Sequence, residues 1–282
     1  MTDPEVLPPD LEGALPVVSI SPARAAALIG VGLASGFFAG LFGIGGGILI
    51  VPALVVVLRL DQRKAVGTSL LAILPAATIS AMIYASSGSV DLVVSAVLAV
   101  GAVTGAQFGA WALTRISRKA AQWVFVGFLI VMIIQLILVL PDRGAAFHLD
   151  LVKGVGLLLL GLLAGTLSAI LGIGGGGVVV PVLMVWFGLG DLAAKGASLV
   201  MMLPGVLSGL VANQRRGNLH LKAGLLIGAG SLFTGPLGAW VAHLISAQVG
   251  DWLFAAFLVF IGITMVREAL RPTTLQAGRS AD

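Results

Sequence analysis

Two glycine clusters with the same flanking sequence lie at a fixed distance from each other in this chain. Residues 40–52 read GLFGIGGGILIVP, and residues 169–181 read AILGIGGGGVVVP. The same offset (172 − 43 = 129) also maps Pro75 onto Pro204 and Trp123 onto Trp252 without gaps. Correspondence over so long a stretch predicts two copies of one structural unit. We place these copies at residues 24–140 and 153–270.

The composition indicates where such a chain folds. Hydrophobic residues make up 59% of the 282 residues and charged residues only 10%, whereas soluble domains carry about 25% charged residues. Charge-free stretches such as 92–113 and 120–140 have the length of transmembrane helices. We therefore predict an all-α, polytopic membrane protein. Outside the two repeats we expect a flexible tail (1–23), a linker (141–152) and a C-terminal tail (271–282).

Each repeat is expected to contain one glycine-interrupted segment followed by three uninterrupted spans. The predicted segments are 24–58, 65–85, 91–113 and 120–140 in the first repeat, and 153–187, 194–212, 221–243 and 251–267 in the second.

The basic residues predict how the repeats are oriented, because Lys and Arg concentrate in short cytoplasmic loops. Arg63 and Lys64 precede the second segment of repeat one, whereas the equivalent loop of repeat two, 188–195, holds only Lys195. Arg215 and Arg216 mark the next loop of repeat two, and its counterpart in repeat one has no base. Equivalent loops should thus face opposite sides. We predict inverted-topology repeats, each with a glycine-broken re-entrant hairpin and three transmembrane helices, and both termini in the cytoplasm. Only three bases then lie outside: Arg143, Lys153 and Lys195.

The glycine clusters are candidates for a binding site at the tips of the two hairpins. Irregular backbone at membrane depth is tolerated only inside protein or beside a water-filled cavity, and glycine permits the positive φ angles such a break needs. The helix that begins after each tip leaves free N–H groups, which bind anions. We expect the two tips to line one substrate site: Gly45, Gly46, Gly47, Gly174, Gly175 and Gly176.

The alternative for any membrane glycine is close packing of helices. We favour packing for two rows of glycines at helical spacing: Gly32, Gly36 and Gly40, and Gly101, Gly105 and Gly109.

Hydroxyl side chains next to the tips extend the candidate site. Thr68 and Ser69 open the second span of repeat one, and Ser198 stands at the matching place in repeat two. We expect these hydroxyls to donate to a bound anion, and the alternative is a hydrogen bond back onto their own helix. For other polar residues inside spans a structural role is favoured: Gln107, Gln135, Thr78 and Ser80.

Several classes of function are disfavoured by the sequence. All 12 acidic residues fall in tails, loops or span ends, so a cation site in the membrane interior is hard to build. The chain has no cysteine, and its histidines suggest no metal site. Residues 172–177 match a dinucleotide motif by letter but lack its soluble βαβ context. Nothing places His243 near Ser208 as in a hydrolase. We expect no enzyme activity, no cofactor, no metal and no nucleic-acid partner.

The paired motifs resemble the TauE/SafE family of sulfite and organosulfonate exporters, over nearly all of residues 25–270. In each half, G-x-G-G-G is followed by proline five positions later (Pro52, Pro181) and then by Gly-Thr-Ser or Gly-Ala-Ser. The resemblance implies a multi-pass inner-membrane protein that exports small sulfur oxyanions, with the matching tip glycines, Thr68, Ser69 and Ser198 at its site. Ala197 stands where repeat one has Thr68, so the second half lacks one hydroxyl.

We therefore expect a secondary transporter that exports sulfite or an organosulfonate such as sulfoacetate by alternating access. The alternatives are a non-transporting scaffold subunit and an anion channel. The expected partners are a small anionic substrate and the lipid bilayer, and the sequence is compatible with a homodimer.

Overall fold

The computed structural model of the chain describes residues 20–112 and 150–269, together with six isolated positions between residues 123 and 134. The predicted span 120–140 lies mostly outside the described residues, and Gln135 is one of the residues outside. Most of the predicted N-terminal tail and linker, and all of the C-terminal tail, lie outside as well.

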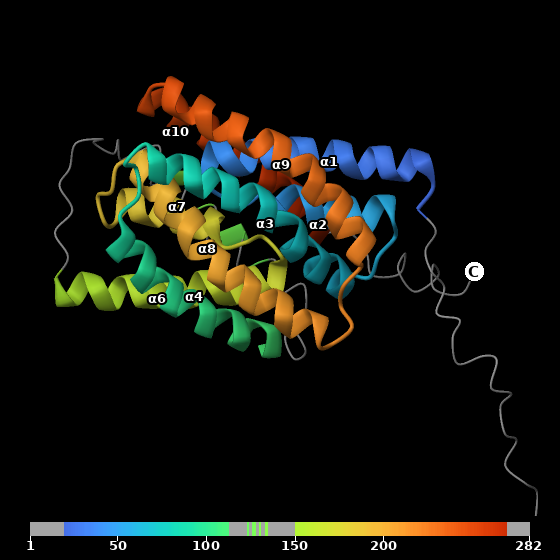
Figure 1. The fold of residues 1–282 in the computed structure, drawn as a ribbon. Helices are drawn as coiled ribbons and strands as arrows, with labels where there is room; N and C mark the ends of the chain where they lie inside the picture. Colours follow the sequence, from blue (N-terminus) through green and yellow to red (C-terminus); the bar gives the residue numbers. More distant parts are fainter. Residues whose placement is uncertain are drawn as a thin grey trace, which may run out of the picture.

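The described residues form helices that lie roughly along a common direction (Figure 1). The helices are α1 (Pro22–Phe42), α2 (Gly47–Val57), α3 (Gln62–Ser86), α4 (Leu92–Ala112), α6 (Leu151–Leu171), α7 (Gly176–Val185), α8 (Asp191–Gln214), α9 (Leu221–Leu244) and α10 (Ala247–Ala269). In the described part of the chain, six helices are long and apolar enough to cross a membrane, while α2 and α7 are shorter. The prediction of an all-α polytopic membrane protein is confirmed.

Each glycine cluster interrupts the helical chain at the same place in its repeat. Gly43 ends α1 with a φ of 70°, and Gly172 ends α6 with a φ of 72°. Gly46 and Gly175 then precede α2 and α7, also in the left-handed region. Side chains with a Cβ rarely adopt this conformation, so the clusters permit breaks that other sequences would resist. The broken segments expected at 24–58 and 153–187 are therefore helix–tip–helix units.

The first long helix of each repeat packs along a helix of the other repeat. Gly32 of α1 lies against Ile227 of α9, and Gly36 lies against Ser231. The residue numbers rise together, so α1 and α9 run parallel. The equivalent pair, α6 and α4, forms the same kind of contact, as Figure 1 shows along the lower edge.

Glycine backbones form both of these helix contacts. In the second pair, Gly101 of α4 lies against Leu158 of α6, and Gly109 lies against Thr166. A Cβ on Gly36 would lie 2.5 Å from the Ser231 carbonyl oxygen, which leaves no room for a side chain. The packing role expected for the two glycine rows is confirmed.

The equivalent helices α3 and α8 cross at the centre of the bundle and run antiparallel. Gly67, near the start of α3, lies against Asn213 near the end of α8, and Gly209 of α8 lies against Leu70. At the other end Gly196 of α8 lies against Ser89, which follows α3. Opposite directions for equivalent helices are what inverted repeats require.

The second hairpin leg returns toward the end of the bundle where the first leg began. Gly224 and Gly235 of α9 lie against Leu71 and Ala76 of α3, so α3 runs parallel to α9 and hence to α1. Two consecutive long helices can run in the same direction only if the segment between them turns back. This agrees with the re-entrant course expected for α2.

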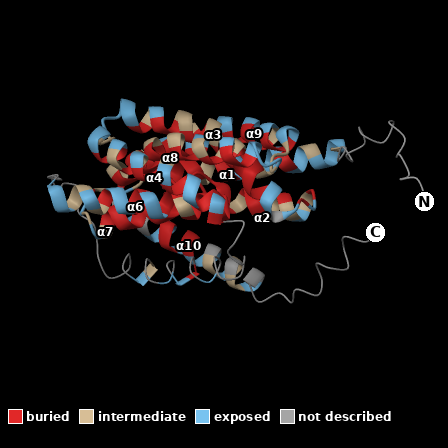
Figure 2. Ribbon diagram, turned by 90° about the horizontal axis from the view of Figure 1, so that it is seen from below, coloured by how far each residue is buried: buried red, intermediate tan, exposed pale blue. Residues whose placement is uncertain are grey.

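Buried residues fill the middle of the bundle, and exposed residues lie along its outside (Figure 2). Many of the exposed side chains are large and apolar, among them Leu151, Phe233 and Val56, with 85%, 74% and 72% of their surface accessible. A soluble protein rarely exposes so much apolar area, and lipid contact accounts for it.

Basic residues gather at one end of the bundle. This end holds the starts of α1, α3 and α9 and the ends of α8 and α10, with Arg24, Arg63, Lys64, Arg215, Arg216, Lys222 and Arg267. The opposite end, in the described part of the chain, holds Lys153 and Lys195. The distribution agrees with the charge asymmetry used to predict the orientation.

Candidate functional site

The two glycine tips meet at the centre of the bundle. Gly47 is the first residue of α2 and lies against the carbonyl oxygen of Gly172. A Cβ added to Gly47 would lie 2.9 Å from the Cα of Ile173. Gly176, the first residue of α7, lies in the same way against the Gly43 carbonyl oxygen. Each hairpin tip therefore touches the start of the other hairpin's short helix, so the expected proximity of the two clusters is found.

The remaining tip glycines pack against α3, α8 and the preceding helix. Gly45 and Gly174 share two neighbours, Ile73 of α3 and Met202 of α8, and the Met202 side chain would lie 2.5 Å from a Cβ at either position. Gly46 lies against the backbone of Ser35 in the middle of α1. The chain thus turns back alongside the middle of α1 before α2 begins. The start of this short helix therefore lies deep in the bundle.

The starts of α2 and α7 are buried and have no capping side chain. Gly46 and Gly175 occupy the N-cap positions, and neither supplies a side-chain hydrogen bond. Helix starts normally place a hydroxyl or carboxylate here to accept from the first amides, and the dipole makes the position attractive to negative charge. Two uncapped starts at one place produce a concentration of positive electrostatic potential inside an apolar bundle.

The hydroxyl residues predicted for the site connect the two repeats. Ser69 donates to the Gly172 carbonyl at 2.9 Å, and Ser198 donates to the Gly43 carbonyl, also at 2.9 Å. The same hydroxyl lies 2.8 Å from the Val66 carbonyl oxygen of its own helix, so the two carbonyls share its single proton. The serine hydroxyls therefore hold the tips in place, and their role toward an anion stays a prediction.

Thr68 has a different role from the two serines. Its hydroxyl oxygen accepts from the backbone N–H of His220 at 2.9 Å, next to the start of α9. Ala197 replaces this threonine in the second repeat. This hydrogen bond joins α3 to the segment before α9 and involves neither tip.

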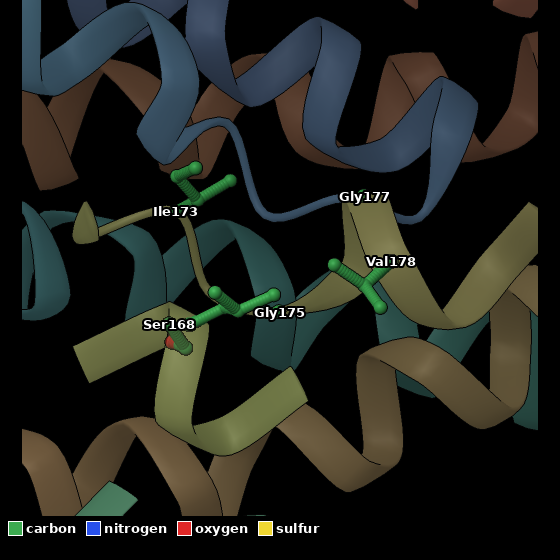
Figure 3. A pocket seen from close by; sticks show the side chains of 6 residues that line it. Ser168, Ile173, Gly175, Gly177 and Val178 are labelled. Carbon is green, nitrogen blue, oxygen red and sulfur yellow. The ribbon is translucent and has the colours of Figure 1, made fainter. Parts of the chain in front are cut away.

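The hollow next to the second tip is small. It lies between α6 and the start of α7, is too narrow to hold a water molecule, and is lined by Leu167, Ser168, Ile173, Gly175, Gly177 and Val178 (Figure 3). The lining is almost entirely apolar, and the tips themselves are in direct contact. In this conformation of the described residues the tips are closed onto each other, and a wide aqueous pocket between them is not seen.

Sequence reasoning missed a pair of charged residues at the start of α8. Lys195 was expected in an outer loop, and this expectation is wrong, because α8 begins already at Asp191 and both side chains are buried. The Lys195 Nζ lies 3.4 Å from the Asp191 carboxylate. Their spacing of four residues, typical of a helical ion pair, was the signal that could have found them.

Gln107 and Thr78 have the structural roles expected of them. Gln107 donates to the Ser208 hydroxyl at 2.7 Å and so joins α4 to α8, and Thr78 donates to Leu74 of its own helix. His243 instead contacts Ser87 at 2.8 Å. Ser208 and His243 therefore have separate partners, and Ser80 is buried without a hydrogen bond in the described structure.

The sequence is similar to bacterial and archaeal membrane proteins over most of its length. It is 25% identical to the "Probable membrane transporter protein YunE" of Bacillus subtilis, covering 86% of this chain and 97% of that protein. It is 29% identical to a "Probable membrane transporter protein" of Haemophilus influenzae, covering 83% and 95%. A relative in Methanocaldococcus jannaschii, "Probable membrane transporter protein MJ0441", is 25% identical over 85% of this chain and 94% of its own. No solved structure matches the chain.

Residues 11–136 and 157–281 match the protein family described as "Sulfite exporter TauE/SafE". The two matched segments include both glycine tips and the helices that hold them, apart from the first turns of α6. With the long relatives named as membrane transporters, these matches make the protein a multi-pass membrane transporter. The chain belongs to the sulfite exporter TauE/SafE family.

Proposed function

We propose that this transporter exports a small sulfur oxyanion, sulfite or an organosulfonate such as sulfoacetate, by alternating access across the cytoplasmic membrane. The proposed site is the contact between the two tips, with Gly45 to Gly47, Gly174 to Gly176, Ser69 and Ser198. Thr68 also belongs to the predicted set, although its hydroxyl bonds to the His220 N–H and to neither tip in this structure.

The observation that carries the proposal is the pair of uncapped, buried helix starts. The α2 and α7 starts each touch the opposite tip, and no side chain satisfies their first amides. A small oxyanion would accept from these amides and interact favourably with both helix dipoles. A cation would meet the positive ends of the same dipoles, which explains why an anionic cargo is favoured.

The closed contact between the tips is compatible with a conformation between inward and outward opening. The contact consists mainly of glycine backbone, so separating the tips exposes little apolar side-chain area, and the hydrophobic cost scales with that area. Antiparallel α3 and α8 support inverted repeats, in which one hairpin enters from each side. Rocking one repeat against the other would then open the site to each side in turn.

Three parts of the proposal come from different evidence. The family description names sulfite, and the buried helix starts favour a small oxyanion. Basic residues at one end of the bundle support cytoplasmic termini, because α1 begins and α10 ends there.

Flux measured in reconstituted vesicles tests the proposal. Vesicles loaded with radiolabelled sulfite or sulfoacetate should lose label faster than protein-free vesicles, and unlabelled substrate on the opposite side should accelerate the exchange. Gluconate, which is large, and choline, which is cationic, serve as controls and should not move. Flux that is proportional to the gradient without trans-acceleration would indicate a channel. No flux of any small anion by folded protein would favour a scaffold subunit and contradict the proposal.

A further inference from the structure

Two buried side-chain atoms in the described part of the chain have no hydrogen-bond partner. They are the hydroxyl oxygen of Ser80 in α3 and the amide oxygen of Asn213 in α8, and both residues are fully buried. Buried polar groups in native proteins are nearly always paired, so each exception needs an explanation. The hydrogen bonds that hold the tips use neither atom.

The Ser80 hydroxyl points away from its own helix. Thr78 of the same helix donates to a carbonyl of the preceding turn, and the Ser231 hydroxyl of α9 lies 2.9 Å from a carbonyl oxygen of its own preceding turn. This bond is open to any serine inside a helix. The Ser80 oxygen instead would lie 3.2 Å from a Cβ on Gly235 of α9. The hydroxyl therefore projects into the contact between α3 and α9.

Ser80 lies on the face of α3 that contacts the tips. Ser69 and Ile73 of this face touch the tips, and Ser80 follows about two helical turns after Ile73. Tyr84 follows one turn later, and its hydroxyl donates to the carbonyl of Gly40 in the last turn of α1 at 3.0 Å. Residues at these spacings share one side of a helix. The α3 row (Ser69, Ile73, Ser80 and Tyr84) thus leads from the tips toward the end of α3.

Polar side chains continue this row to the surface, at the end of the bundle opposite to the basic residues. The His243 ring lies against the Tyr84 ring, with centroids 4.9 Å apart. The His243 Nε2 lies 2.8 Å from the hydroxyl oxygen of Ser87, which is exposed. Serine, tyrosine and histidine can each donate a hydrogen bond, and none of them is negatively charged at neutral pH. Their chemistry suits an anion.

The second repeat has the equivalent row on α8. The offset of 129 maps the α3 row onto Ser198, Met202, Gly209 and Asn213 in the same order (84 + 129 = 213), and we call these four residues the α8 row. Because α3 and α8 run antiparallel, the α8 row leads from the tips to the end where the basic residues gather. The Asn213 amide nitrogen donates to the Gly209 carbonyl at 2.9 Å, and the amide oxygen has no donor in the described structure.

We propose that the two rows line the two access routes of the transported oxyanion, the outer route along the α3 row and the inner route along the α8 row. This inference deepens the proposed function and rests on it. Inverted repeats place equivalent helices on opposite sides of a shared site, so each helix supplies one route.

The unpaired atoms fit routes that are closed in this conformation. A buried polar atom without a partner raises the free energy of the closed state, and water satisfies the atom when the route opens. Ser80 and Asn213 therefore each favour opening on their own side of the tips. The Ser80 hydroxyl is also the first donor that an oxyanion meets on the α3 row beyond the tips.

Ser80→Ala tests the outer route. The hydroxyl has no partner in the closed structure, so its removal should leave the Tm in detergent unchanged or raise it. Loss of a donor to the anion should lower the flux of sulfoacetate about tenfold, the scale of one hydrogen bond to a charged group. Ser231→Ala is the matched control: its hydroxyl has a partner, so the Tm should fall while the flux stays. Full flux in Ser80→Ala would overturn the inference.

Thiol labelling tests both routes without measuring transport. The chain has no cysteine, so Ser80→Cys and Asn213→Cys each carry a single thiol. The probe is sulfonatoethyl methanethiosulfonate, a membrane-impermeant anion. We expect Ser80→Cys to react when the probe is added to the outer side, and Asn213→Cys only in inside-out vesicles. Two controls at the depth of Ser80 should not react: Ala81→Cys, which is buried on another face of α3, and Met82→Cys, which is exposed among apolar side chains.

The labelling pattern separates this inference from the proposed function. In variants with the Tm of wild type, two unreactive cysteines, or two that react from the same side, would overturn the routes. Flux in wild type would then leave the proposed function standing. Labelling from opposite sides without flux of any small anion would contradict transport and leave the two routes standing.

Discussion

At the scale of the residue, the tip glycines differ in how much space there is for an added side chain. A Cβ on Gly176 would lie 2.6 Å from the Ile44 Cα and 2.9 Å from the Ser198 hydroxyl oxygen, which itself bonds to Gly43. Its neighbour Gly177 meets only the end of the Ile48 side chain, at 3.6 Å. Two adjacent glycines of the same helix turn thus have opposite steric requirements, and they form a matched pair.

Gly176→Ala should separate the tips, whereas Gly177→Ala should be tolerated. Overpacking at Gly176 should lower the free energy of unfolding by about 1–3 kcal/mol, and displacement of the site should reduce the flux at least tenfold, about the scale expected for small misplacements. Gly177→Ala should change the stability little, because alanine favours the helix. Tm in detergent and flux in vesicles are the measurements. Equal flux in the two variants would contradict close contact at Gly176.

The residues of the site were only partly predictable from the sequence. The tip glycines and Ser198 stand out because the repeat aligns them and because three adjacent glycines are unusual in a membrane helix. The burial of Lys195 was not predictable from charge counting, since a lysine near a span end has the same local sequence whether it faces water or protein. Its neighbours include Gly43 and Gly250, which are distant in sequence.

At the scale of the element, glycine rows decide which helices approach closely. The row on α1 allows the backbones of α1 and α9 to touch, and the row on α4 does the same toward α6. Helical spacing of small residues predicts that a face is used for packing. It does not identify the partner, because the partner helix lies in the other repeat and is not marked by any local pattern. Both pairings emerge only from the fold.

Gly36→Ala should destabilise the protein, and Gly30→Ala should not. A Cβ on Gly36 would meet Ser231 atoms at 2.5 and 2.6 Å, whereas nothing lies within 4 Å of a Cβ on Gly30 in the same helix. We expect a loss of about 1–3 kcal/mol for the first variant and no loss for the second, measured by thermal unfolding in detergent. Similar midpoints for both variants would show that α1 and α9 are not closely packed.

At the scale of the whole molecule, exchange of helices between the repeats produces one bundle from two copies. The first long helix of each repeat packs against a helix of the other repeat (α1 on α9, and α6 on α4). Helices α3 and α8 cross between these two pairs. The antiparallel course of α3 and α8 and the basic residues at one end of the bundle agree with inverted repeats. The sequence predicted this arrangement from the basic residues in the loops. The closed state of the tips was not predictable, because a repeat pattern specifies the connections of a transporter and not the conformation that it adopts.

The most direct test of the account is a reversible cross-link between the starts of α2 and α7. The chain has no cysteine of its own, and the Ile48 Cδ1 lies 3.6 Å from a Cβ on Gly177, a position that tolerates a side chain. In the variant Ile48→Cys/Gly177→Cys, a short thiol cross-linker should join the two helix starts and stop anion flux, and a reductant should restore it, while each single variant stays active. Complete cross-linking with undiminished flux would contradict the claim that the tips must separate for the anion to pass.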